Sequence, residues 1–437
     1  MKNSDSTAKT AASKVLRHLR AGDLRPLAQL AVQSTAGITA VVEGVHQSVW
    51  STLGAPGAPG ADQAGQTRGI TGLVYRSIEG VTQAVGKTLD VALTELGPLF
   101  QLVDGKPADT PERLAVLAAL NGVMGDRLAA TGSPLATTMG FYAHGRLLNL
   151  QKPLQNQLKK QLQGPSVGAA PGGKLLLVIH GLCMNDLQWQ TVHEGQPVNH
   201  GQQLAAALNA TPVYLRYNTG LHVSENGHLL AALLEQLFQS WPQAVTELTV
   251  LVHSMGGLVI RSALHSAASR GLHWPALVKS IVFLGTPHHG SPLERAGNAI
   301  DVLLGSTRWS KPFGQLAQLR SGGITDLRYG FLADTDWQDQ ARFRSAPDKR
   351  LPLPLPAHIA CYTVAATVAS QRSLLADRLV GDGLVPLHSA LGQHASPERN
   401  PHFPKTHQRI VYRTNHMQLL SSPEVGQQLL RWLAPGD

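Results

Sequence analysis

Apolar and polar positions follow two different periods along this chain of 437 residues. In the first third, apolar residues recur every three or four positions, which is the spacing of amphipathic helices. From residue 170 onward, short apolar runs of strand length alternate with helix-length amphipathic stretches. The Gly- and Pro-rich segment 164–173 separates the two patterns. We therefore expect a helical N-terminal region, residues 1–165, and an α/β domain, residues 170–437.

The second pattern predicts a mostly parallel sheet with helices on both faces, because strands and helices alternate along the chain. Residues 291 to about 356 interrupt this alternation. We interpret them as an insertion that forms a lid over the C-terminal ends of the strands, where ligands bind in such sheets. Strands are expected at 174–180, 211–217, 247–253, 278–285, 357–364 and 409–414, and helices at 199–209, 226–240, 256–270 and 423–433.

The N-terminal region contains an internal repeat. Residues 43–49 (EGVHQSV) match residues 79–85 (EGVTQAV), with the Gly- and Pro-rich segment 54–60 between them. The second copy carries one apolar stripe from Ile70 to Leu96, so the repeat predicts an amphipathic helical hairpin. The stripe either packs on protein or docks reversibly on a lipid surface, and its Thr-, Gln- and Ser-rich polar face favours packing on protein. Further helices are expected at 111–130 and about 144–162.

Ser254 follows an apolar strand-like run and precedes two glycines and a helix-like segment, in the order Val252-His-Ser-Met-Gly-Gly257. This pattern predicts a nucleophile elbow, a turn so tight that the serine adopts a strained backbone conformation with its hydroxyl exposed. The glycines let the strand and the helix approach each other. The usual motif is G-x-S-x-G, and Val252 stands in place of its first glycine. A serine that only caps the helix is the alternative interpretation.

An acid and a base follow this serine along the chain. Asp382 lies in a turn with a glycine on either side, and His416 lies just past the last predicted strand. A serine hydroxyl needs an adjacent base, so we assign His416 as the general base and Asp382 as the residue that holds its tautomer. Taken alone, Asp382 would be interpreted as a turn former. Asp334 and Asp336 are rival acids, but both fall within the predicted lid.

Two backbone amides are candidates for an oxyanion hole. The N–H of Met255 follows the nucleophile directly, and the N–H of Leu182 lies just after His180-Gly181, at the end of the first strand of the α/β domain. His180 itself is expected to support this loop. The neighbouring histidines 253, 288 and 289 do not follow the last strand, so we expect the pair 288–289 to be structural rather than catalytic.

Together these segments resemble the α/β-hydrolase superfamily, in particular its lipase/esterase branch, and are similar to the group related to the GPI inositol-deacylases. The resemblance covers roughly residues 170 to 435 and does not extend to the N-terminal third. It implies an α/β-hydrolase fold and ester hydrolysis, but no named substrate, since substrates vary widely within that group. The resemblance is carried by residues 252–257, 283–291 (FLGTPHHGS), 381–385 and 415–416, and also by 214–220 and 225–227.

Composition adds few restrictions. The hydrophobic content of 43% is ample for a core, and no apolar run long enough for a transmembrane helix or a secretory signal occurs in the sequence. The two cysteines, Cys183 and Cys361, are expected to be small core residues, and one disulfide remains an alternative. The formal charge of +9 fits an anionic membrane surface or ordinary solubility. No metal-ligand spacing, phosphate-binding loop or nucleic-acid motif is present, so no cofactor, metal or nucleic acid is expected.

The sequence thus predicts a serine hydrolase that cleaves carboxylic esters through an acyl-enzyme on Ser254, with an acyl-ester or lipid-like substrate. Acyl transfer by the same triad is one alternative, because it differs only in the nucleophile that reaches the acyl-enzyme. A membrane- or partner-binding protein on a hydrolase scaffold is another. The expected location is cytoplasmic, with peripheral membrane contact through the N-terminal helices as an option.

Overall fold

The computed structural model describes residues 111–161, 172–291, 321–338, 350–370 and 381–434. The chain divides into two compact units, one of Met1–Thr137 with Ile300–Arg320 and one of Thr138–Ala299 with Ser321–Asp437. The predicted N-terminal repeat, and with it the predicted membrane contact, lies outside the described residues. In the first unit, the predicted helix at 111–130 is confirmed as α6, Pro111–Ala130.

The second unit is built on a sheet of eight strands in the order β10-β9-β8-β7-β3-β6-β1-β2. The six strands from β10 to β6 are all parallel, β1 pairs with β6 in antiparallel orientation, and β2 pairs with β1 in antiparallel orientation. A two-stranded ribbon, β4 with β5, lies outside this sheet. The strands are β1 Gly140–Ala143, β2 Arg146–Leu147, β3 Lys174–Ile179, β4 Thr191–His193, β5 Gln196–Val198, β6 Thr211–Arg216, β7 Glu247–His253, β8 Val278–Leu284, β9 Ala360–Thr367 and β10 Gln408–Tyr412.

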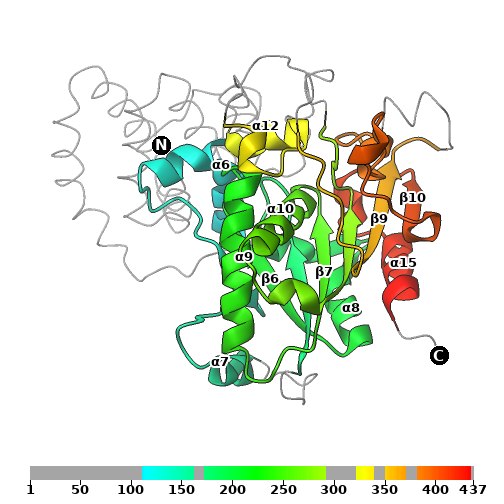
Figure 1. Ribbon diagram of the computed structural model, residues 1–437. Helices are drawn as coiled ribbons and strands as arrows, with labels where there is room; N and C mark the ends of the chain where they lie inside the picture. The colour runs from blue at the N-terminus through cyan, green and yellow to red at the C-terminus, as the bar shows by residue number, and fades with distance from the viewer. Residues whose placement is uncertain (1–110, 162–171, 292–320, 339–349, 371–380, 435–437) are drawn as a thin grey trace, which may run out of the picture. The chain divides into compact units, whose positions relative to one another are not determined.

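Helices cover both faces of this sheet, as Figure 1 shows. Leu204 of α8 and Val425 of α15 join Leu176 and Leu251 of the sheet in one hydrophobic core, while α9 and α10 pack together on the opposite face. Burial on both faces explains why the central strands are almost continuously apolar. The helices are α7 Leu154–Gln161, α8 His200–Leu208, α9 Val223–Ser240, α10 Met255–Ser269, α12 Gly322–Tyr329, α14 Leu387–Ala390 and α15 Pro423–Leu433. Short 3₁₀ helices span Asp186–Trp189, Trp274–Leu277, Asp334–Asp336, Pro397–Arg399, Lys405–His407 and Met417–Leu420.

The predicted α/β fold with a mostly parallel sheet is confirmed, and the arrangement is consistent with the α/β-hydrolase fold. Each of the six predicted strands corresponds to an observed parallel strand, and each of the four predicted helices to an observed helix. None of the helices in the described part of the chain combines the length and the apolar character needed to cross a bilayer. Both cysteines are free and buried.

The edge of the sheet next to β6 differs from the prediction. A helix was expected over about 144–162, but helix α7 begins only at Leu154, and β1 and β2 form a hairpin that pairs with β6. His144 and Gly145 connect the two strands with φ angles of 48° and 73°. Positive φ at both residues of a two-residue loop is typical of a type I′ turn, whose twist matches that of paired strands. The sheet therefore begins before residue 170.

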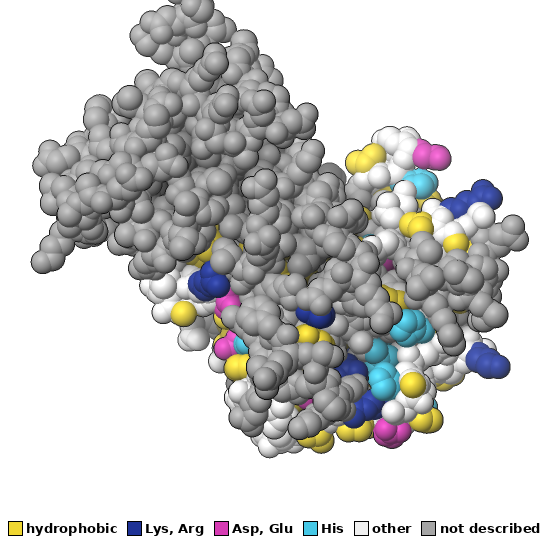
Figure 2. Space-filling model, turned by 90° about the horizontal axis from the view of Figure 1, so that it is seen from above, with side chains coloured by type: hydrophobic (Ala, Val, Ile, Leu, Met, Phe, Trp, Pro, Cys, Tyr) yellow, Lys and Arg dark blue, Asp and Glu magenta, His cyan; other side chains and the backbone are white. Residues whose placement is uncertain are grey.

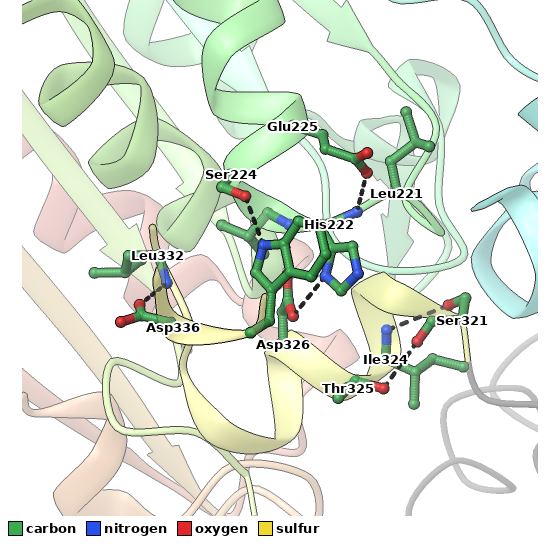
Figure 3. A network of polar contacts seen from close by, with 12 residues as sticks. Leu221, His222, Ser224, Glu225, Ser321, Ile324, Thr325, Asp326, Leu332 and Asp336 are labelled. Carbon is green, nitrogen blue, oxygen red and sulfur yellow. Dashed lines mark hydrogen bonds and ion pairs between the residues drawn. The ribbon is translucent and has the colours of Figure 1, made fainter. Parts of the chain in front are cut away.

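The predicted insertion is described only in part, chiefly over residues 321–338. Helix α12 in this part is held against the start of α9 (Figure 3). The Asp326 carboxylate accepts hydrogen bonds from His222 Nδ1 at 2.9 Å and from the Val223 N–H at 2.7 Å. The Gly323 N–H also donates to the Gly220 carbonyl at 3.1 Å. These contacts fix α12 beside the loop that follows β6, at the C-terminal edge of the sheet.

Candidate active site

Ser254 lies in the turn that joins β7 to α10, with φ 53° and ψ −123°. This backbone conformation is strained for a residue with a side chain, and it persists only where the surroundings impose it. Two backbone hydrogen bonds impose this conformation on Ser254. The Ser254 N–H donates to the Leu284 carbonyl of β8 at 2.8 Å, and the Ser254 carbonyl accepts from the Gly257 N–H at 3.0 Å. The predicted elbow geometry is therefore present at this serine.

Close packing around the turn explains the two glycines. A Cβ at position 256 would lie 2.7 Å from the His180 carbonyl oxygen, and one at position 257 would overlap the Thr286 side chain. Val252, in contrast, lies in the regular part of β7, where it pairs with Ile179 and Phe283 of the neighbouring strands. A β-branched residue fits such a ladder position. The first glycine of the usual motif is therefore not needed for this turn.

Asp382 and His416 are brought into direct contact. His416 Nδ1 lies 2.6 Å from Asp382 Oδ2, and both side chains are buried. The other carboxylate oxygen, Oδ1, accepts hydrogen bonds from the Leu384 N–H at 2.9 Å and the Val385 N–H at 2.7 Å. Since a carboxylate can only accept, the imidazole proton resides on Nδ1, and Nε2 keeps its lone pair. The imidazole is thereby held in the tautomer that a general base requires.

The imidazole of His416 also lies beside the strand that carries Ser254. Its ring centroid is 4.6 Å from that of His253, the residue before the serine, and His253 Nε2 lies 3.2 Å from the His416 carbonyl oxygen. A Cβ added to Gly285 would be 3.1 Å from His416 Cε1, and Gly285 follows the carbonyl that binds the Ser254 amide. The ends of β7, β8 and β10 thus place the serine and the imidazole at one edge of the sheet.

Two backbone amides next to Ser254 have no acceptor among the residues that the structure describes: Leu182 N–H and Met255 N–H. Met255 begins α10, so its amide lies at the positive end of the helix dipole. Leu182 follows Gly181, where a Cβ would lie 3.0 Å from the Ser254 Cβ. Buried amides usually find partners, so two unpaired ones beside a strained serine are suited to bind a developing negative charge.

A comparison with protein families identifies the domain that contains this serine. Residues 170–339 match the family model of the PGAP1-like alpha/beta domain. This segment is therefore similar to the PGAP1-like alpha/beta domain. The predicted resemblance to the GPI inositol-deacylase group is thereby confirmed. The matched segment contains Leu182, Ser254 and Met255, whereas Asp382 and His416 lie beyond it.

Solved structures of lipases and esterases are also similar to part of this chain. The mature form of lipase BlEst2 from Bacillus licheniformis aligns at 18% identity over 63% of this chain and 96% of its own, with a TM-score of 0.39. EstA from Clostridium botulinum aligns at 13% identity over 60% and 88%, with a TM-score of 0.37. Lipase 1 from Pelosinus fermentans aligns at 12% identity over 61% and 100%, with a TM-score of 0.35. A search of the curated proteins found no match.

Tyr217, for which the sequence predicted no role of its own, supports the candidate oxyanion loop. Its hydroxyl donates to the His180 carbonyl at 2.9 Å, and its ring stacks on the His180 imidazole at 4.5 Å. Burial, with a smaller contribution from the charge of Arg216, lowers the pKa of His180 to about 3. The neutral imidazole lies 2.9 Å from the Gly181 carbonyl through Nδ1. His180 therefore holds the loop, as predicted, and carries no charge into the site.

His288 and the two rival acids of the matched segment are engaged elsewhere. His288 Nδ1 accepts a hydrogen bond from Arg261 at 3.3 Å. Asp334 binds His228 at 2.9 Å, and Asp336 accepts the N–H groups of residues 332 and 333. Seen from above, His and Lys or Arg side chains lie close together on the described part of the surface (Figure 2). No group of acidic, Cys or His side chains among the described residues is arranged to hold a metal ion.

Proposed function

We propose that the protein is a serine hydrolase that cleaves carboxylic esters through an acyl-enzyme on Ser254. The observation that carries this proposal is the buried 2.6 Å contact between His416 Nδ1 and Asp382 Oδ2. It supplies an oriented base at the sheet edge where Ser254 occupies a strained turn. The family match to a PGAP1-like alpha/beta domain supports the same class of chemistry.

In the first half of the reaction, His416 Nε2 accepts the Ser254 hydroxyl proton while Oγ attacks the ester carbonyl carbon. The resulting oxyanion binds the N–H groups of Leu182 and Met255. The C–O bond to the alcohol then breaks, and His416 returns the proton to the leaving oxygen. Asp382 stays ionised and stabilises the imidazolium that forms between the two proton transfers.

In the second half, water takes the place of the alcohol. His416 removes a proton from the water, whose oxygen attacks the acyl carbon, and the same amides bind the second oxyanion. Collapse of this intermediate releases the carboxylic acid and returns the proton to Ser254 Oγ. The loss of one oxyanion donor typically lowers kcat by about 100- to 1,000-fold, so the two amides are expected to contribute as much as the base.

The proposed substrate is an acyl ester of lipid-like or small aliphatic character. If an alcohol instead of water attacks the acyl-enzyme, the same residues carry out acyl transfer. Product analysis with p-nitrophenyl butyrate, in the presence and absence of an added alcohol, distinguishes the two activities. Hydrolysis predicts butyrate as the main product in both cases, whereas transfer predicts a new butyrate ester.

The nucleophile is tested with a fluorophosphonate probe and p-nitrophenyl butyrate. We expect wild-type protein to be labelled and active, and Ser254→Ala to be neither. Ser262→Ala is a matched control, because Ser262 is a buried serine of α10, the helix that follows Ser254, and its hydroxyl donates to the Leu332 carbonyl at 2.7 Å. Labelling that persists in Ser254→Ala would assign the nucleophile to another residue.

A further inference from the structure

A groove lies between α10 and the proline-rich segment that precedes β9. Its volume is about 200 Å³, and it is lined by Arg261, Leu264, His265 and Ala268 of the helix and by residues 353–356. The four helical residues are spaced as one face of an α-helix. The opposite wall, Leu-Pro-Leu-Pro, is entirely apolar in its side chains. Arg261 is thus the only Lys or Arg among the groove residues.

Arg261 is buried, with 6% of its surface exposed. Its Nη1 donates to His288 Nδ1 at 3.3 Å and its Nη2 donates to the Leu353 carbonyl at 2.7 Å. A guanidinium has five N–H donors, so three remain without a hydrogen-bond acceptor among the described residues. No carboxylate of this part of the chain pairs with Arg261, either by hydrogen bond or by salt bridge. Among the described residues, the cation is therefore buried without a compensating charge.

The side chains of His288 and Arg350, which lie near Arg261, do not supply the missing negative charge. Because a guanidinium only donates, His288 Nδ1 must be unprotonated, and burial together with the charge of Arg261 holds the His288 pKa well below its usual value. Burial, and the nearby charge of Arg350, lower the pKa of Arg261 to about 10. A buried cation in such surroundings is costly unless an anion accompanies it.

We propose that this groove binds a small aliphatic carboxylate, with the anionic group on Arg261 and the alkyl chain against Leu264, Leu353 and Leu355. A planar carboxylate matches the fork of a guanidinium and can accept two N–H bonds at once. A groove of about 200 Å³ is smaller than the 300–1,000 Å³ typical of drug-sized ligands, so a short chain fits it. Arg261 lies seven residues after Ser254, or about 10 Å along the helix, so this site is separate from the candidate active site.

Calorimetric titration of the full chain with three probes tests the proposal. Sodium hexanoate should bind saturably. Hexan-1-ol, which has the chain but no charge, and inorganic phosphate, which has the charge but no chain, should each bind at least about tenfold more weakly, since charge-assisted pairs and apolar burial both contribute. Equal affinity for hexanoate and hexan-1-ol would refute the role of Arg261. Equal affinity for hexanoate and phosphate would refute the role of the apolar walls.

Three variants locate the binding. Ala268→Trp fills the groove from an exposed position of α10, and it should weaken hexanoate binding by at least about tenfold while hydrolysis of p-nitrophenyl butyrate stays within about twofold of wild type. Ser269→Trp is the matched control, because Ser269 is the next exposed residue and does not line the groove. Arg261→Met should also lose binding, and its Tm is measured beside that of wild type, because the change leaves His288 Nδ1 and the Leu353 carbonyl without their donor.

Unchanged hexanoate affinity in Ala268→Trp would overturn the proposal even if Arg261→Met fails to fold. That result would assign the binding to another site, such as the one at Ser254. Loss of binding in Ala268→Trp but not in Ser269→Trp, with or without esterase activity in the wild type, supports the groove site independently of the proposed catalytic function.

Discussion

Replacing Asp382 with Asn separates the position of the acid from its charge. In the wild type, Oδ1 accepts two backbone N–H groups, from Leu384 and Val385, and Oδ2 accepts His416 Nδ1–H. The side-chain oxygen of the introduced Asn will occupy the position of Oδ1. If the amide were rotated, its NH₂ group would face the N–H donors of Leu384 and Val385, and both hydrogen bonds would be lost. The NH₂ group then faces His416 Nδ1.

This arrangement reverses the tautomer of His416. Because the amide now donates, Nδ1 must accept, and the proton moves to Nε2, where it blocks removal of the Ser254 proton. The equivalent change in a serine protease of known mechanism lowers kcat by about 10,000-fold. By transition-state arithmetic, that factor corresponds to about 5.5 kcal/mol of activation free energy. Stability should change little, since the two backbone hydrogen bonds to the side-chain oxygen are kept.

The assay combines the rate of p-nitrophenyl butyrate hydrolysis, the rate of fluorophosphonate labelling and thermal unfolding. Asp336→Asn is the matched control, because Asp336 is also a buried aspartate that accepts two backbone N–H groups but pairs with no histidine of the described residues. We expect the control to keep its hydrolysis rate within a few fold of wild type. An Asp382→Asn protein that folds normally and hydrolyses the ester within tenfold of the wild-type rate would refute the assigned relay.

Two further predictions concern stability. Burial raises the pKa of Asp326 from 3.8 to about 6, so its contribution is fully present below pH 3.8 and is lost as the pH rises through 6. The unfolding free energy of the wild type, relative to Asp326→Asn, should therefore fall by about 2 kcal/mol between pH 4 and pH 8 in denaturant titrations, and a flat difference would contradict the assignment. A chain that begins at residue 166 lacks β1, β2 and the buried Phe141, so it should be at least about 3 kcal/mol less stable than one that begins at Thr138, as measured by urea unfolding.

The sequence was sufficient for the central sheet because each strand there is buried on both faces. Residues 248–252, for example, are apolar apart from Thr249 and lead directly to His253 and Ser254, and such a run is typical of a strand that is buried on both faces. That Ser254, Asp382 and His416 lie at one edge of the sheet could be predicted for a related reason. The C-terminal ends of parallel strands lie at one edge, so residues that follow different strands come together whatever their separation in sequence.

Other features depend on contacts that no local pattern encodes. The strand at 140–143 is short, and its pairing with β6 becomes visible only when the neighbour is known, although the His144-Gly145 loop is a usable hairpin signal. Tyr217 supports the candidate oxyanion loop only because β6 lies next to β3. Nothing in the local sequence of Arg261 indicates that no carboxylate of the described residues would pair with it.

Asp382 and His416 lie beyond the matched family segment and follow the insertion in the chain. The insertion separates β8 from β9 by many residues, yet the two strands pair in parallel from Ser280 with Ala360 to Leu284 with Val364. The sheet register therefore fixes the place of the acid and the base, and the length of the insertion does not. Helix α12 is anchored separately, through Asp326 and His222 at the start of α9. Changes to the insertion that keep this anchor should therefore leave the contact between Asp382 and His416 undisturbed.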